Sequence, residues 1–186
     1  MEEMQPNPGK KTGKKSSWIK RIGLFILGVF IIIQFFQPGK NNQSLDMTND
    51  LAKVVTVPDD VQKILKTACY DCHSNNTFYP WYSNIQPVGW WLKDHIDEGK
   101  EHLNFQEFAL VEPSERFPTR ALRQDHKLEE VAEMVEEGEM PLKSYTVIHR
   151  EAKLDDAQKK MISDWVKAAR SELMKNNQAS APTEDD

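Results

Sequence analysis

Apolar residues recur along most of this chain at the three- and four-residue intervals of amphipathic helices. One stripe follows Pro58, and further stripes cover residues 87–99, 122–137 and 154–173, separated by loops that Pro and Gly mark. No stretch shows the sustained alternation, rich in β-branched residues, that is typical of a strand. The pattern therefore predicts an all-α domain over residues 57–174.

The N-terminal part has a different pattern, a nearly continuous apolar run. From Ile22 to Phe36 the chain is apolar except for Gln34, and counting from Trp18 gives a segment of 19 residues. At about 1.5 Å per residue, such a helix nearly covers a hydrocarbon core of ~30 Å. We therefore expect a single transmembrane anchor over residues 18–36. A cleaved signal peptide is the alternative, although no small-residue cleavage site follows the run.

Charge divides the chain at the same place. Residues 1–40 carry seven Lys or Arg and two acidic residues, a net charge of +5, whereas residues 41–186 carry a net charge of −10. The basic excess before the span predicts a cytoplasmic N-terminus in the inner membrane and residues 41–186 on the periplasmic side. The acidic domain also argues against binding of nucleic acid.

The segments around these two regions are polar. We expect a basic cytoplasmic leader over residues 1–17, a tether over residues 37–56 and a disordered acidic tail over residues 175–186. The expected architecture is thus an anchor, a tether and one helical domain, with the lipid bilayer as a partner of the N-terminal helix.

Two cysteines and a histidine follow the first helix of the domain as Cys69-x-x-Cys72-His73. This CxxCH spacing is the signal for attachment of a c-type haem. Two thiols one helical turn apart can form thioethers with the two vinyl groups of a haem, and the adjacent imidazole can be the proximal iron ligand. We therefore expect one covalent haem c, with an iron, held by Cys69, Cys72 and His73.

Other interpretations of the same spacing remain open. A CxxC pair can be a thiol-redox centre, but that motif normally lies in a βαβ unit, which this sequence lacks. It can also be half of a zinc site, completed by two further histidines. The histidines available for that role are His95, His102, His126 and His149.

The sixth position of the iron requires a second ligand, and Met140 is the first candidate. It lies in the sequence Gly138-Glu139-Met140-Pro141, where Pro141 fixes its own φ and stiffens the loop. Thioether ligation is common in electron-carrying haems. A gap-filling core role for Met140 is the alternative, and His95 and His102 are the other candidate ligands.

These segments resemble the exported haem-binding domain family, a cytochrome-c-like group. The likeness rests on ACYDCHSNNTFYPWYSNIQPVGWWL at 68–92, EGEMPLKSYTVIH at 137–149 and a closing helix with Trp165. The resemblance covers about residues 37–173. It implies a cytochrome-c-like helical fold around one covalent haem, with His73 as proximal ligand and Met140 as distal ligand.

Aromatic residues are dense after the cysteine motif, and we expect them to supply the dry surface of a haem pocket. They are Phe78, Tyr79, Trp81, Tyr82, Trp90 and Trp91. Tyr145, just beyond Met140, is a candidate hydrogen-bond donor to a haem propionate.

The functional prediction is a membrane-anchored monohaem c-type cytochrome that passes single electrons between membrane-associated partner proteins. Two axial ligands leave no open position on the iron, so we do not expect an enzyme. The acidic domain would attract basic patches on its redox partners. The alternative is a haem-based sensor or small-ligand binder with a labile or open sixth position.

Overall fold

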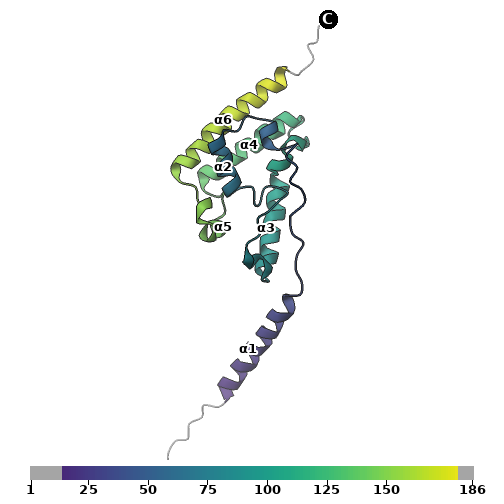
Figure 1. Ribbon diagram of the computed structural model, residues 1–186, viewed down its shortest axis with the longest axis vertical. Coiled ribbons are helices and arrows are strands. Elements are labelled where there is room, and N and C mark those ends of the chain that lie inside the picture. Colours follow the sequence, from purple (N-terminus) through teal and green to yellow (C-terminus); the bar gives the residue numbers. More distant parts are fainter. Residues whose placement is uncertain (1–13, 180–186) are drawn as a thin grey trace, which may run out of the picture. The chain divides into compact units, whose positions relative to one another are not determined.

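The computed structural model describes residues 14–179, and the regular elements in that range are helices (Figure 1). The α-helices are α1 (Lys14–Ile33), α2 (Asp59–Ala68), α3 (Val88–His102), α4 (Arg120–Glu137), α5 (Lys143–Ile148) and α6 (Asp156–Ala179). Short 3-10 helices connect them: η1 (Leu51–Lys53), η2 (Trp81–Asn84), η3 (Phe105–Leu110) and η4 (Arg150–Ala152). The prediction of an all-α fold is confirmed over these residues.

The chain divides into two compact units. The small unit consists of Met1–Pro38 and Pro80–Trp91, and the large unit consists of Gly39–Tyr79 and Leu92–Asp186. The cysteine motif and Met140 both belong to the large unit.

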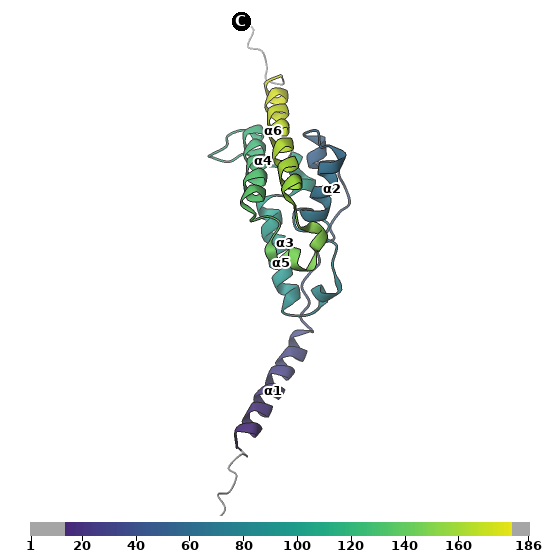
Figure 2. The same cartoon turned by 90° about the vertical axis from the view of Figure 1, so that its left-hand side faces the viewer.

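The core of the large unit forms around the pair α4 and α6, which lie side by side in Figures 1 and 2. Leu128 of α4 and Ile162 of α6 are fully buried, and Leu65 of α2 packs into the same cluster. The apolar stripes read from the sequence are therefore the faces that these helices bury.

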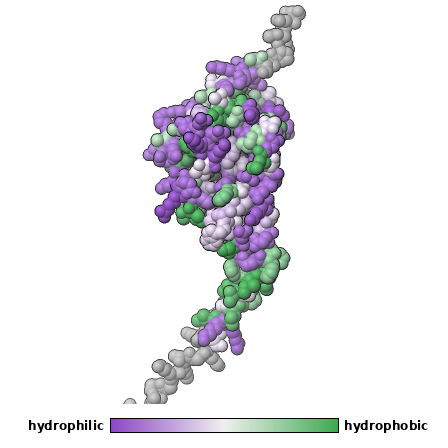
Figure 3. Space-filling view, viewed as in Figure 1, coloured by the Kyte–Doolittle hydropathy of each residue, from purple (hydrophilic) through white to green (hydrophobic). Residues whose placement is uncertain are grey.

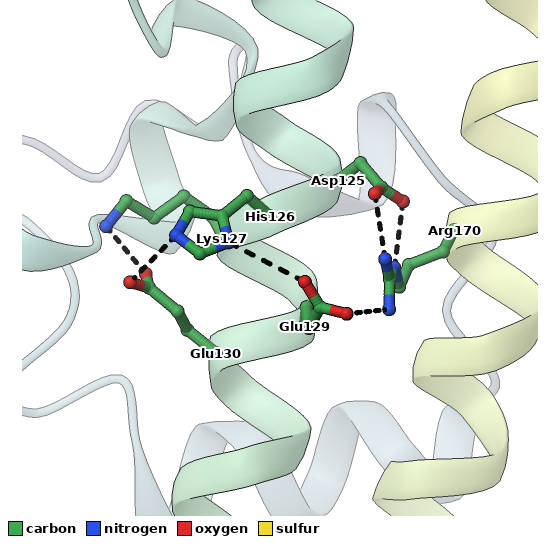
Figure 4. Close-up of polar contacts among 6 residues, drawn as sticks. All are labelled: Asp125, His126, Lys127, Glu129, Glu130 and Arg170. Atoms are coloured by element: carbon green, nitrogen blue, oxygen red, sulfur yellow. Dashed lines mark hydrogen bonds and ion pairs between the residues drawn. The ribbon is translucent and has the colours of Figure 1, made fainter. Parts of the chain in front are cut away.

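Ion pairs join the same two helices at their partly exposed edge (Figure 4). The Arg170 guanidinium on α6 donates to both carboxylate oxygens of Asp125 at 2.8 and 2.9 Å, and to Glu129 at 2.9 Å. His126 lies in the same network, 3.6 Å from Glu129 and 3.3 Å from Glu130. This histidine is therefore part of a charged helix surface.

The prediction of a transmembrane helix over residues 18–36 is wrong. Among residues 14–179, no helix is both long enough and apolar enough to cross a bilayer. α1 begins at Lys14, so its 20 residues include Lys and Arg, and it ends at Ile33. Only 16 residues of the predicted segment are helical, which at 1.5 Å per residue is about 24 Å against a core of ~30 Å. The apolar side chains of α1 are exposed in the structure, as Figure 3 shows.

Gln34, which interrupts the apolar run, has a structural role at the end of α1. Its amide nitrogen donates to the carbonyl of Gln86 at 3.1 Å, and its amide oxygen accepts from the Gln86 backbone at 2.9 Å. The buried Gln86 side chain donates to Gln37 at 3.0 Å, and the Trp90 indole donates to the Phe36 carbonyl at 2.7 Å. These bonds hold the small unit together, and the helix ends where they begin.

Residues 39–56, most of the expected tether, belong to the large unit, whereas residues 37 and 38 belong to the small unit. Leu51 is fully buried, and the Asp50 carboxylate accepts from the Tyr70 hydroxyl at 2.9 Å. The Trp165 indole of α6 donates to the carbonyl of Thr56 at 3.0 Å. The polar composition predicted a tether, although Leu51 and Val55 are buried and, of the large apolar residues in this segment, only Leu45 is largely exposed, at 80%.

The expected leader and tail fall largely outside the described residues. Residues 1–13 and 180–186 are not described, whereas residues 14–17 belong to α1 and residues 175–179 continue α6. The expectation of a disordered tail therefore differs from the structure at its start, because α6 continues for six residues beyond its last buried side chain, Leu173.

Candidate haem site

The cysteine motif folds as a tight turn at the end of α2, and we call residues 69–73 the CxxCH turn. The backbone N–H groups of Cys72 and His73 both donate to the Cys69 carbonyl, at 3.1 and 2.9 Å. The Cys69 N–H continues the helix by donating to Leu65 at 2.9 Å. These local hydrogen bonds fold the motif into one turn that carries both cysteines and the histidine.

The His73 imidazole is oriented by the backbone of the segment after α3. Its Nδ1 lies 2.9 Å from the Leu103 carbonyl oxygen. A carbonyl only accepts, so Nδ1 carries the proton and Nε2 keeps its lone pair. This is the arrangement found for histidines that bind metals through Nε2.

Burial keeps this imidazole neutral. Desolvation lowers the pKa of His73 below its usual value, and its hydrogen bonds to the Leu103 and Gly99 backbone oppose that shift only in part. The Phe105 ring lies edge-on at 6.0 Å between ring centroids. A neutral, oriented imidazole is the form that can ligate iron.

Helix α3 packs closely on the CxxCH turn at Gly99. A Cβ atom at this position would lie 3.0 Å from the Cys72 carbonyl oxygen and 3.4 Å from the Cys72 Cβ. The sequence places Gly99 near the end of a helix, and α3 does end three residues later, at His102. Because glycine has no Cβ, it also allows the helix to approach Cys72 closely.

Polar side chains fix the chain that leaves the CxxCH turn. Asn75 donates from its backbone to the Gln106 side chain at 3.1 Å, and its own amide donates to Glu107 at 2.7 Å. The Thr77 hydroxyl donates to the Asp71 carbonyl at 2.6 Å. Sequence analysis assigned these residues no role, although a polar run directly after CxxCH is the signal that would have found them.

The surroundings of the two thiols do not favour thiol-redox chemistry. Desolvation raises the pKa of Cys69 to about 12, with a smaller contribution from Cys72. Desolvation, followed by the charge of Asp71, raises the pKa of Cys72 to about 11. Reactive redox thiols have lowered pKa values instead.

The structure gives the zinc alternative no ligand set. Within residues 14–179, no group of three or more His, Cys, Asp or Glu side chains could hold a metal ion. His95 and His102 lie on α3, and His102 is close enough to His73 to affect its pKa. His126 is in the α4 surface network, and His149 stacks on the Tyr145 ring at 4.3 Å.

Met140 lies in the connection between α4 and α5, and we call residues 138–142 the Met140 loop. Gly138 ends α4 with φ of 76°, which glycine adopts without strain. The backbone N–H groups of Glu139 and Met140 both donate to the Met134 carbonyl at 3.0 Å. Met140 is half-buried and lies off the apolar stripe of α4, as the sequence indicates.

Tyr145 of α5 joins this region to the CxxCH turn. Its hydroxyl donates to Asp71 Oδ2 at 2.8 Å, and Asp71 Oδ1 accepts from the Phe78 backbone at 3.0 Å. Tyr145 was expected to face a haem propionate, and the structure gives its hydroxyl a protein partner. Asp71 lies between the two cysteines, so this bond links segments about 70 residues apart in sequence.

The aromatic segment is shared between the two units. Phe78 and Trp81 are 77% and 75% exposed, and the Tyr79 hydroxyl accepts from the Asn41 backbone at 2.7 Å. The expected aromatic pocket stays a prediction, because Pro80–Trp91 belongs to the small unit.

A cavity of about 260 Å³ lies beside the segment that orients His73. Its lining includes Leu103, together with His102, Lys100 and Arg123, but none of the predicted haem-binding residues. The haem interpretation therefore rests on the donor groups. An imidazole whose Nδ1 donates to a backbone carbonyl, next to two cysteines at CxxCH spacing, fits a c-type haem.

An all-helical fold with an oriented histidine next to two cysteines is typical of helical haem-binding proteins. A family model described as a haem-binding domain matches residues 28–168, and the chain belongs to that family. The resemblance predicted from the sequence is confirmed at this level. No curated protein and no solved structure matches the chain.

Proposed function

We propose that this haem-binding protein is a monohaem c-type cytochrome that carries single electrons between partner proteins. The observation that carries the proposal is a hydrogen bond of His73, the last residue of the CxxCH turn. Its Nδ1 donates to the Leu103 carbonyl at 2.9 Å. This bond leaves Nε2 of the proximal histidine ready for iron without any rearrangement of the ring.

Cys69 and Cys72 would hold the group covalently. Each thiol would add across one vinyl double bond, forming a C–S bond while the thiol hydrogen moves to the other vinyl carbon, so no oxidant is required. The high pKa values of both thiols, about 12 and 11, favour the protonated form that this addition uses.

Met140 is the proposed sixth ligand. It lies in a loop whose start is held by two backbone bonds to Met134 at 3.0 Å, and its end leads into the helix that Tyr145 ties to Asp71. When bound, the haem would supply a one-electron couple between ferric and ferrous iron. Two protein ligands favour a carrier over an enzyme, because neither axial position is open to a substrate.

The negative charge of the large unit supports the proposal that its redox partners are basic. Residues 41–186 carry a net charge of −10, so the large unit would attract proteins with basic docking patches, less strongly as salt rises.

The proposal is tested on protein produced in a host that attaches c-type haem. We expect haem staining on a denaturing gel, a mass increased by one haem, and a ferric spectrum with the charge-transfer band of methionine ligation. Cys69→Ala with Cys72→Ala should lose the stain, and Met140→Ala should lose the band but keep the stain.

Two results would contradict the proposal. Parent protein with the mass of the unmodified chain would exclude covalent attachment. Rapid binding of CO to the reduced parent, at the rate seen for Met140→Ala, would favour the sensor or small-ligand binder, because the sixth position would then be open.

A further inference from the structure

We infer that the Tyr145–Asp71 hydrogen bond, which we call the clasp, holds the Met140 loop to the CxxCH turn. It would thereby set how easily the sixth ligand leaves the iron. This inference rests on the proposed function, because it assumes a haem at Cys69 and Cys72 with Met140 as a ligand. It adds Tyr145 and Asp71 as positioning residues.

The first step of the argument is that the Met140 loop has few other ties. Within residues 14–179, the backbone hydrogen bonds of the loop join it to Met134 and Val135 on one side and to residues 145 and 146 on the other. α5, which follows it, has no buried residue. The loop is therefore held to α4 at its start, and its far end depends on how α5 is held.

The second step is that Tyr145 holds α5. Its ring packs against the core cluster and stacks on His149 at 4.3 Å with an angle of 17°. Its hydroxyl donates to Asp71 at 2.8 Å, a bond to a charged acceptor, which is stronger than one between neutral groups. Tyr145 is only five positions after Met140, so loss of the bond frees the chain that carries the ligand.

The third step is that Asp71 is itself fixed. Its other carboxylate oxygen accepts from the Phe78 backbone at 3.0 Å, and its carbonyl accepts from the Thr77 hydroxyl at 2.6 Å. Asp71 also lies between the cysteines. The clasp therefore ties the distal ligand segment directly to the residues that would hold the haem from the proximal side.

The experiment compares two hydroxyl groups that donate to a carboxylate. Tyr145→Phe removes the clasp, and Thr56→Val removes the hydroxyl that donates to Glu172 at 3.0 Å, outside both the CxxCH turn and the Met140 loop. Imidazole is titrated into each ferric protein and followed in the Soret region. An external ligand binds in proportion to the fraction of molecules whose sixth position is open.

We expect Tyr145→Phe to bind imidazole about tenfold more tightly than the parent, as loss of a hydrogen bond to a charged group implies. Thr56→Val should bind it with the affinity of the parent. In an Asp71→Ala background, Tyr145→Phe should cause no further change, because the acceptor is already gone.

Each other outcome decides a separate point. Equal affinities for the parent and Tyr145→Phe, or equal increases for Tyr145→Phe and Thr56→Val, would overturn the clasp. A full additional effect of Tyr145→Phe in the Asp71→Ala background would also overturn it. Parent protein without covalent haem, or with the imidazole affinity of Met140→Ala, would instead overturn the proposed function.

Discussion

The CxxCH turn and the Met140 loop are held in different ways. Contacts from distant parts of the large unit fix the turn and the chain just after it. They are the Leu103 carbonyl on His73, the close approach of Gly99 to Cys72, and the Gln106 side chain on Asn75. The Met140 loop is bonded to nearby positions in sequence, and Tyr145 provides its link to the turn. The fold thus fixes the side of the proposed proximal ligand, His73. The loop of the proposed distal ligand, Met140, depends on one side chain, that of Tyr145.

This difference predicts which of the two proposed axial ligands can exchange. A histidine with its orientation fixed by the backbone stays in place whether or not the iron is bound to it. A ligand on a lightly held loop can leave without disturbing the core. We therefore expect variants on the proximal side to change folding and haem content, and variants on the distal side to change ligand exchange.

The largest effect is expected from Gly99→Val, which breaks the proximal side. Its side chain would be forced against Cys72, 3.0 Å from the added Cβ, and such overpacking costs about 3 kcal/mol. We expect a lower free energy of unfolding in urea and a reduced haem content per chain. Gly28→Val is the control, because it is also in a helix and its Cβ would meet nothing within 4 Å. Similar losses in both variants would argue against the Cys72 contact as the cause.

A loss of stability of about the same size is expected from Gln106→Ala, which sharpens the comparison. The buried Gln106 side chain accepts from Asn75 and donates to the carbonyls of Ser44 and Asp46, at 2.7 to 3.1 Å. Loss of three such bonds should lower the free energy of unfolding by about 3 kcal/mol, against about 1 kcal/mol for Gln124→Ala.

Gln124 is the matched control because it is equally buried and makes one bond, to the Phe108 carbonyl at 2.8 Å. Urea unfolding followed by circular dichroism measures both variants. Equal losses would show that the bonds to Asn75, Ser44 and Asp46 add nothing to the stability of the proximal side.

The smallest effect concerns pH and the two tyrosines. Desolvation, ahead of the interactions with their aspartate partners, raises the pKa of both Tyr70 and Tyr145. Their contribution to stability is complete below the unfolded pKa of about 10 and is lost as pH rises further, because the unfolded chain then ionises first.

We therefore expect thermal stability to fall above pH 10 in the parent. The fall should be smaller in Tyr70→Phe and in Tyr145→Phe, since each variant lacks one ionisable hydroxyl. Melting temperatures measured by circular dichroism between pH 8 and about 11 test this window. An undiminished fall in either variant would show that its tyrosine does not titrate with unfolding.

Local patterns in the sequence were enough for the helices and for the CxxCH turn. The turn closes through bonds within five residues of sequence, from Cys72 and His73 to Cys69. Met140 was chosen as a candidate ligand because it follows a helix end that Gly138 marks, and its role as a ligand stays a prediction. Each of these features depends on residues next to one another in the chain.

The features that sequence analysis missed depend on distant residues. The length of α1 follows from Gln34, whose partner Gln86 is 52 positions away. The orientation of His73 depends on a carbonyl 30 positions away, which no side-chain pattern encodes. Tyr145 was recognised as a donor, but its acceptor, Asp71, became evident only once α5 was placed beside the turn.

The burial of Leu51 and the bond from the Tyr70 hydroxyl to Asp50 have a consequence for trimming the protein. A fragment that starts at residue 57 would keep every proposed ligand yet lack the buried Leu51 side chain and the acceptor of the Tyr70 hydroxyl. A fragment that is to keep these two contacts therefore has to begin no later than Asp50.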